Sequence, residues 1–164
     1  MEGRQMTPEQ LTVLKNYILA TPELAAKPMT PDGAYSIAQE LNKEKNPAFV
    51  VWKTSVNMDE IMRNGMDWAR VDNLTVGKAR IWDWIGRLGS FNASKVNIRT
   101  GIDAAWVGTA ADLAVRATVY THCKRNAKIA EALLATGTGT TADPATLVHE
   151  GDVNYYQIME ARAL

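Results

Sequence analysis

The sequence contains very few of the residues from which catalytic and metal sites are usually built. Its 164 residues include one cysteine, Cys123, and two histidines, His122 and His149. A single cysteine excludes an intrachain disulfide and favours folding in a reducing compartment. Neither the HExxH nor the CxxC spacing occurs, which argues against a zinc site. We therefore expect no metal.

An excess of one charge and a long apolar run are also missing. The 18 basic residues are matched by 18 acidic ones, so no global field draws the chain to nucleic acid or to an anionic membrane. No window reaches the ~18 uninterrupted apolar residues of a membrane span, and MEGRQMTPEQ lacks the pattern of a signal peptide. We expect a soluble cytosolic product without membrane contact, folded as a single helical domain over residues 1–164.

Tryptophan, in contrast, is clustered. Four of the five tryptophans fall between residues 49 and 91, and each can bury roughly 150–250 Å². This stretch must therefore contribute to the core or to a surface that binds a partner. We expect three tryptophans to lie in the core: Trp68, Trp84 and Trp106.

The helix predicted from about Val76 to Leu88 divides the tryptophan cluster. Its apolar residues at i, i+3, i+4 and i+7 are Ile81, Trp84, Ile85 and Leu88. We expect this stripe to face the core. Trp82 lies about 200° from Trp84 around the axis, so the two cannot share one narrow stripe, and one of them is partly exposed or covered by another element. With Trp84 on the stripe, Trp82 is the candidate for a partner surface. Because tryptophan and arginine are typical of interface hot spots, the candidate protein interface consists of Trp52, Trp82, Arg80 and Arg87.

Hydrophobic periodicity elsewhere predicts a mainly α-helical fold. Two short amphipathic helices are expected after Thr7 and after Thr30, packed against the tryptophan stretch. Helical spacing from about 110 to 135, without proline or glycine, predicts one long helix at the centre of a small bundle. The segments 49–52 and 146–149 are short and extended, and we expect them to pair as a minor two-stranded β element.

The segment after the predicted long helix is rich in glycine and threonine and is expected to be a loop. Gly137 and Gly139 resemble a phosphate loop only in composition, because the segment follows a helix and lacks the Gly-Lys-Ser/Thr ending. We therefore expect no nucleotide and no other cofactor. The N-terminus, the loop 136–145 and the C-terminus are expected to be mobile or ordered by partners.

His122 and Cys123 are the only adjacent pair that suggests a thiolate–imidazole site. On a helix, neighbouring side chains point about 100° apart, so the two cannot form the hydrogen bond that nucleophilic catalysis requires. We expect a buried thiol beside a surface histidine, and no enzymatic activity.

Between residues 112 and 131 the chain carries basic residues without an acidic one. The candidate basic strip consists of Arg116, Lys124, Arg125 and Lys128. On the predicted long helix, Lys124 and Lys128 are i, i+4 neighbours. Such a strip is either a solvated face or a contact for nucleic acid or an acidic partner.

Most of the chain resembles a family of small structural proteins of tailed bacteriophages and prophages. The resemblance is carried by the segments MTPEQLTVLKNYI, NPAFVVWKTSV, DWARVDNLTVGKARIWDWI and LLATGTGTTADPATLVHEGDVNYYQIMEAR. It implies a virion protein, made in the host bacterial cytoplasm, that acts as a head–tail adaptor or connector. The implied partners are further copies of the chain in a twelve-fold ring, the portal protein, a tail or head-closure component, and genomic DNA contacted non-specifically in the channel.

Two other functions stay open from the residues alone. One is a phage DNA-binding module for packaging or regulation, which would use the basic strip. The other is a tail assembly chaperone, which would bind a tail protein and then be left out of the particle.

Overall fold

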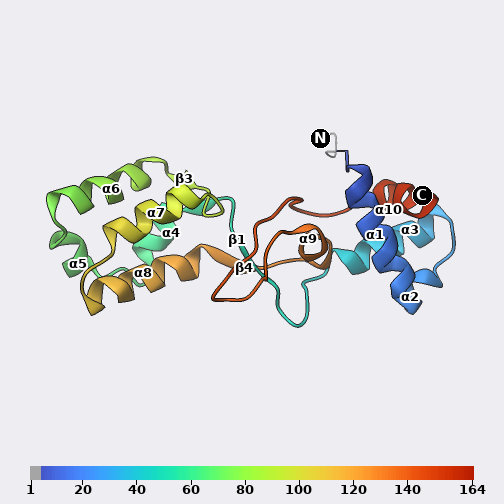
Figure 1. Cartoon of the computed structure of the whole chain (residues 1–164), viewed down its shortest axis with the longest axis horizontal. Coiled ribbons are helices and arrows are strands. Elements are labelled where there is room, and N and C mark those ends of the chain that lie inside the picture. Colours follow the sequence, from blue (N-terminus) through green and yellow to red (C-terminus); the bar gives the residue numbers. More distant parts are fainter. Residues whose placement is uncertain (1–4) are drawn as a thin grey trace. The chain divides into compact units, whose positions relative to one another are not determined.

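The computed structural model describes residues 5–164 and confirms that the fold is mainly helical, with two small two-stranded antiparallel sheets (Figure 1). The helices in this part of the chain are α1 (Pro8–Ala20), α2 (Pro22–Ala25), α3 (Pro31–Leu41), α4 (Met58–Arg63), α5 (Trp68–Asp72), α6 (Val76–Arg87), α7 (Val96–Ala105), α8 (Ala110–His122), α9 (Ile129–Leu134) and α10 (Tyr155–Ala163). The strands are β1 (Val50–Trp52), β2 (Val56–Asn57), β3 (Ser90–Phe91) and β4 (Lys124–Asn126). Within the described residues, no helix is long and apolar enough to cross a lipid bilayer.

The chain divides into two compact units. Unit 1 combines the chain up to Val50 with Asn126–Leu164, and unit 2 is Val51–Arg125. Each unit has its own cluster of buried apolar side chains. The chain passes between the units within β1 and again within β4, and these two strands pair with each other. The single domain expected from the chain length stays a prediction.

Unit 1 is built from α1, α2, α3, α9 and α10, with α10 packed against both α1 and α3. A capping box opens α1 at the expected Thr7: the Thr7 hydroxyl accepts from the Gln10 N–H at 3.3 Å, and the Gln10 side chain accepts from the Thr7 N–H at 3.0 Å. The Thr30 hydroxyl caps α3 by accepting from the Gly33 N–H at 3.2 Å. The largest fully buried apolar side chains of this unit are Leu14, Ile18, Ile37, Leu41 and Ile158.

Two polar side chains close the irregular backbone of unit 1. The Asn42 amide donates to the Val153 carbonyl at 2.9 Å and accepts from the Val153 N–H at 2.8 Å. The buried Glu131 carboxylate accepts from the N–H groups of Lys128 and Gly151, both at 2.9 Å. Buried backbone N–H and C=O groups need hydrogen-bond partners. In these loops the partners are the side chains of Asn42 and Glu131.

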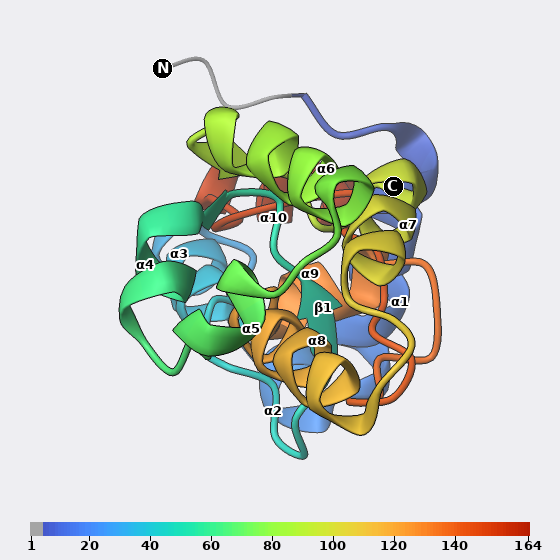
Figure 2. The ribbon, with the colours of Figure 1, turned by 90° about the vertical axis from the view of Figure 1, so that its left-hand side faces the viewer.

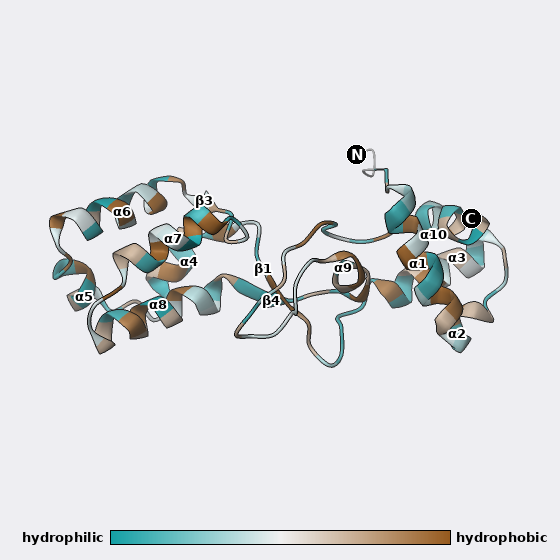
Figure 3. Cartoon of the chain, viewed as in Figure 1, coloured by the Kyte–Doolittle hydropathy of each residue, from teal (hydrophilic) through white to brown (hydrophobic). Residues whose placement is uncertain are grey.

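Unit 2 contains α4 to α8 and the antiparallel pair β2–β3, in which Val56 lies opposite Phe91. Figure 2 is seen from the side of this unit, with α6 next to α7, against which it packs. Hydrophobic residues recur along α6, α7 and α8 (Figure 3). At the centre, the rings of Trp82 and Trp106 meet edge to face with centroids 5.4 Å apart at 76°, a favoured geometry for aromatic pairs.

The expected orientation of α6 is wrong. Trp82 is buried, with 4 % of its surface exposed, whereas Trp84 is 64 % and Leu88 is 52 % exposed. The helix turns its Trp82 side inward because α7 covers that side closely. A Cβ atom on Gly101 of α7 would lie only 3.4 Å from Cδ1 of Ile85. Of the three tryptophans expected in the core, Trp106 is fully buried, but Trp68 and Trp84 are exposed.

The predicted long helix is also wrong. α8 ends at His122, and the chain then forms β4 before α9 begins at Ile129. The Cys123 carbonyl accepts from the Lys53 N–H at 2.8 Å, and the Ala127 N–H donates to the Phe49 carbonyl at 2.8 Å. Pairing with the β1 segment thus replaces the helical hydrogen bonds, although the sequence contains no proline or glycine at the break.

The expected pairing of 49–52 with 146–149 is replaced by the pairing of β1 with β4. The C-terminal segment still lies nearby, since the Ala145 N–H donates to the Val50 carbonyl at 2.9 Å. The segment 136–145 is a loop, as predicted, closed by a bridge between Thr136 and Thr146. The first two amphipathic helices pack with α9 and α10, not with the tryptophans, which belong to the other apolar cluster.

Two substitutions two residues apart on α6 test this orientation. We expect Trp82→Ala to lower the free energy of unfolding by about 3–5 kcal/mol, because it removes a buried ring and leaves a cavity. The matched variant Trp84→Ala is expected to change it by less than about 0.5 kcal/mol, because that ring is exposed. Urea unfolding followed by circular dichroism measures both. Equal losses from the two variants would contradict the orientation described here.

Candidate protein interface

The outward side of α6 is an uncovered apolar stripe. Val76, Trp84 and Leu88 are 75 %, 64 % and 52 % exposed, and Arg80 is exposed between them. These residues follow one another at i, i+4, i+8 and i+12, so they share one side of the helix. We call this set, Val76, Arg80, Trp84 and Leu88, the α6 face. It is a run of large apolar side chains that unit 2 leaves open to solvent.

A groove lies between α5 and α6 in the same unit. Its volume is about 530 Å³, and its lining residues are Met58, Met62, Trp68, Val71, Trp82, Asp83, Gly86 and Arg87. Trp68 on α5 is 61 % exposed. Methionine adapts its shape to irregular partners, and a groove with an exposed tryptophan at its wall suits an inserted apolar side chain.

An ion pair holds α5, and with it Trp68, against α8. The Arg70 guanidinium donates to Oδ1 of Asp112 from Nη2 at 2.7 Å and from Nε at 3.1 Å. The other oxygen of Asp112 accepts from the Thr109 hydroxyl at 2.8 Å and completes the capping box of α8. The hydrogen bonds from Arg70, and then those from Thr109, lower the pKa of the Asp112 carboxyl below its usual value. Its carboxylate is therefore the form that ties the two helices together.

The candidate interface expected from the sequence is only partly exposed. Arg80 and Arg87 lie at the surface, as an interface requires, but Trp82 is buried and cannot present its ring to a partner. Trp84 and Trp68 are the exposed tryptophans that the expectation missed. A signal for Trp84 was present, since the charged residues Arg80 and Arg87 fall on its side of the helix. The interface role itself stays a prediction.

Trp52 lies in a separate cationic and aromatic cluster of unit 2. The Arg99 guanidinium is 4.7 Å and the Lys124 ammonium 5.3 Å from the centre of its ring. The Tyr120 ring packs against it edge-on with centroids 5.5 Å apart. The Tyr120 hydroxyl donates to Oδ1 of Asp103 at 2.7 Å, and burial together with that carboxylate raises the Tyr120 pKa. Trp52 as a whole is half-buried.

The sequence predicts that the candidate basic strip runs along one helix. In the structure it does not. Arg116 lies on α8, 3.6 Å from a carboxylate oxygen of Asp103, whereas Lys124 and Arg125 lie in β4. Lys128 belongs to unit 1, where it forms an ion pair with Asp152. Because α8 ends before Lys124, the i, i+4 relation that defined the strip does not exist. Contact of these residues with nucleic acid stays a prediction.

The expected buried thiol is confirmed, since Cys123 is fully buried at the end of α8. Burial raises the pKa of its thiol to about 12, so the thiolate is scarce at neutral pH. His122 is more covered than expected, with 17 % of its side chain exposed and Nε2 lying 3.1 Å from the Asn64 carbonyl. In the described part of the chain, no group of three or more His, Cys, Asp and Glu side chains is placed to hold a metal ion.

The glycines of the 136–145 loop serve close packing. Gly137 and Gly139 have φ of +125° and +71°, which favours glycine over residues with a side chain. A Cβ atom on Gly139 would lie 2.3 Å from the Phe49 ring. The Thr138 hydroxyl donates to the Asp143 carboxylate at 2.7 Å. These contacts give the glycines and Thr138 a structural role within the loop that does not involve a bound phosphate.

No protein-family model, curated protein or solved structure matches this chain. The resemblance to phage structural proteins stays an expectation that rests on its sequence segments.

The Cys123 thiol gives a chemical test of the end of α8. We expect the native chain to resist a thiol reagent such as iodoacetamide at pH 8 and to react stoichiometrically in urea, because the sulfur is buried and protonated. The matched variant Cys123→Ala/Thr121→Cys carries its only thiol at an exposed position of the same helix and should react without urea. Mass spectrometry measures both. Rapid modification of native Cys123 would contradict its burial.

The Arg70–Asp112 pair predicts a pH-dependent stability. The pKa of Asp112 is lowered in the folded chain, so its stabilisation is present above the unfolded pKa of about 3.9 and is lost as the pH falls through the folded value. We expect Asp112→Asn to lower Tm clearly at pH 7, and the difference from the wild type to shrink only as the pH falls below about 3.9 towards the lowered folded pKa. Thermal unfolding from pH 3 to 7 measures the difference.

The control for this prediction is Asp59→Asn. Asp59 pairs with Arg63 at 2.9 Å on the exposed side of α4. Exposed pairs of this kind contribute little, so we expect a nearly constant and small Tm difference across the same range. A Tm difference for Asp112→Asn that does not depend on pH would mean that the carboxylate charge is not what holds α5.

Proposed function

We propose that this chain is a structural protein of a tailed-phage virion, a head–tail connector that acts by docking and without catalysis. The observation that carries the proposal is the α6 face, with Trp84 and Val76 open to solvent beside Arg80. Contiguous apolar surface of this kind mostly marks sites of protein–protein interaction. Three of the four residues of the face, Val76, Arg80 and Trp84, fall within the segment DWARVDNLTVGKARIWDWI, one of those that carry the resemblance.

A connector needs surfaces that are stable in the free subunit and become buried in the particle. The α6 face meets this need, because its helix is anchored from the other side by Trp82, Ile85 and the packing of α7. Docking therefore requires no unfolding. The groove beside Trp68 offers a second place for an apolar anchor, and hot spots on the two partners tend to pair.

The partners of this role follow from the proposed position in the virion. They are further copies of the chain in a twelve-fold ring, the portal protein, and a tail or head-closure component, with genomic DNA passing through the channel. The chain would be made in the host cytoplasm and incorporated into the particle.

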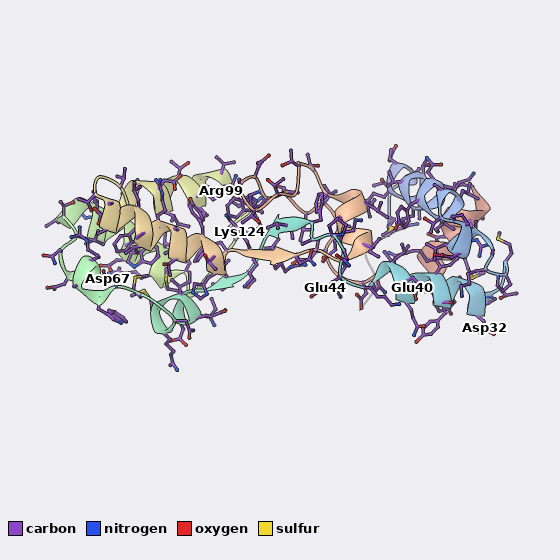
Figure 4. The ribbon with its side chains drawn as sticks, turned by 90° about the horizontal axis from the view of Figure 1, so that it is seen from below. Asp32, Glu40, Glu44, Asp67, Arg99 and Lys124 are labelled. Carbon is purple, nitrogen blue, oxygen red and sulfur yellow. The ribbon has the colours of Figure 1, made fainter. Side chains whose placement is uncertain are left out.

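A DNA-binding module is the second candidate, favoured by the cluster around Trp52. Arg99 and Lys124, both labelled in Figure 4, lie over the ring of Trp52, which as a whole is half-buried. Basic side chains beside an aromatic ring suit nucleic acid. Arg99 also donates to the Ala93 carbonyl at 2.8 Å, which accounts for its position structurally and leaves the connector as the better-supported role.

Mass spectrometry of purified phage particles tests the connector role. We expect peptides of this chain in the virion at a fixed ratio to the portal protein, near one copy per portal subunit for a twelve-fold ring. A phage carrying Trp84→Ser is expected to accumulate heads and tails that are not joined, because an exposed anchor of docking is lost. Circular dichroism of the purified variant controls for folding.

Two outcomes would contradict the proposal. A chain that is abundant in the lysate and absent from particles is not a virion protein, and its co-purification with a tail protein would identify an assembly chaperone. Salt-sensitive DNA binding that is lost on Lys124→Ala, with no chain in the particle, would identify the DNA-binding module.

A further inference from the structure

The neutral chain consists of two units with opposite charge. Unit 2 carries 11 Lys and Arg against 7 Asp and Glu, and the rest of the chain carries 7 against 11. The formal charges are therefore +4 for unit 2 and −4 for unit 1. Two copies of such a chain attract each other when the positive unit of one approaches the negative unit of the other.

The positive unit concentrates charge beside its exposed apolar residues. Arg80 belongs to the α6 face, and Arg87 follows it at the wall of the groove, with Asp83 as the only acidic residue of the helix. Lys78, on the buried side, donates to the Val107 carbonyl within unit 2. The surface that carries Trp84 is thus both apolar and basic.

The negative unit has a surface of matching character on α3. Asp32, Tyr35, Gln39 and Glu40 are exposed on one side of this helix, and Tyr35 is 57 % exposed. We call these four residues the α3 face. Glu40 also forms an exposed ion pair with Lys43 at 2.6 Å. Figure 4 labels Asp32 and Glu40 along the helix and Glu44 just beyond its end. Beside them lies a groove of about 670 Å³ whose walls include Tyr35, Asn154 and Tyr155.

We propose that the α6 face of one copy docks on the α3 face of a second copy, so that copies associate head to tail. Arg80 and Arg87 then face carboxylates, while Trp84 and Tyr35 bury each other's exposed rings. Because the two faces differ, a docked pair of copies keeps one free face of each kind, and the association continues into a ring or a filament. The inference rests on the proposed function in that it names the partner of the α6 face.

Two other occupants fit the α6 face less well. A symmetric contact between two α6 faces would bring the arginines of both copies together, which is repulsive. Double-stranded DNA would pair with Arg80 and Arg87 but would leave Val76, Trp84 and Leu88 against a polar, hydrated backbone. A second copy offers both the opposite charge and an apolar surface.

The test uses two charge-reversed forms of the full chain. One carries Arg80→Glu and Arg87→Glu on the side of α6, and the other carries Asp32→Lys and Glu40→Lys on the α3 face. Sedimentation velocity and light scattering are measured at low and high salt, at up to about 1 mM chain so that contacts of millimolar Kd are populated. We expect the wild type to form species larger than dimers at low salt and to dissociate as the salt rises.

Mixing the two variants gives the decisive measurement. Each variant alone is expected to lose at least about tenfold in apparent affinity, because one of its two faces is reversed. The α6 face retained by one variant and the α3 face retained by the other still match. The two reversed faces are also opposite to each other in charge. An equimolar mixture should therefore associate again and, like the wild type, grow beyond the dimer at low salt. A matched control, Arg63→Glu with Lys95→Glu, makes the same charge change in unit 2 outside the α6 face and should associate like the wild type.

Several results would overturn the inference. These are a wild type that stays monomeric at every concentration and salt, association that survives the reversal of Arg80 and Arg87, and a mixture of the variants that forms no dimer. DNA binding through Arg80 and Arg87 without self-association would do the same. A chain that is present in virions but never self-associates overturns this inference alone, whereas self-association of a chain missing from virions overturns the connector role alone.

Discussion

The edge-to-face contact of Trp82 with Trp106 decides what unit 2 presents to its surroundings. Both rings are buried, with centroids 5.4 Å apart. A helix has only one rotational freedom about its axis, so placing Trp82 inside places Trp84, about 200° away, outside. The uncovered stripe of Val76, Trp84 and Leu88 is the geometric consequence of one buried ring pair. The same contact that stabilises unit 2 thereby creates its candidate interface.

Features that depend on neighbours in sequence could be predicted. The Thr7 and Thr30 hydroxyls cap their helices as expected, and Thr75 and Asn57 do the same for α6 and α4. A cap is a hydrogen bond between residues two or three apart, so its partners stand together in the sequence. The break after His122 has no such local cause. It depends on the Lys53 N–H that meets the Cys123 carbonyl, a partner 70 positions away.

The candidate site could be predicted only in part. The spacing of apolar residues alone did not identify which side of α6 faces the core. Two apolar sides existed on the predicted helix, one through Trp84 and one through Trp82, and spacing alone favoured the longer stripe. The tertiary partners reversed this choice, because α7 packs against α6 and the Trp106 ring meets the Trp82 ring. The charged residues Arg80 and Arg87 mark the outward side. If the positions of the charged residues are weighed together with those of the apolar residues, the sequence predicts that Trp84 lies on the outward side.

The zero net charge of the chain hides the opposite charges of its two units, and the reason is the topology of the chain. Unit 1 is assembled from both ends of the chain, whereas unit 2 is one continuous segment. A sum over the whole sequence therefore adds a basic middle to two acidic flanks and gives zero. Electrostatic attraction acts between surfaces, within a Debye length of about 8–10 Å at physiological salt, so the charge of each unit matters more than the sum. A chain that looks electrically neutral can thus carry both halves of a complementary pair, which is what head-to-tail association requires.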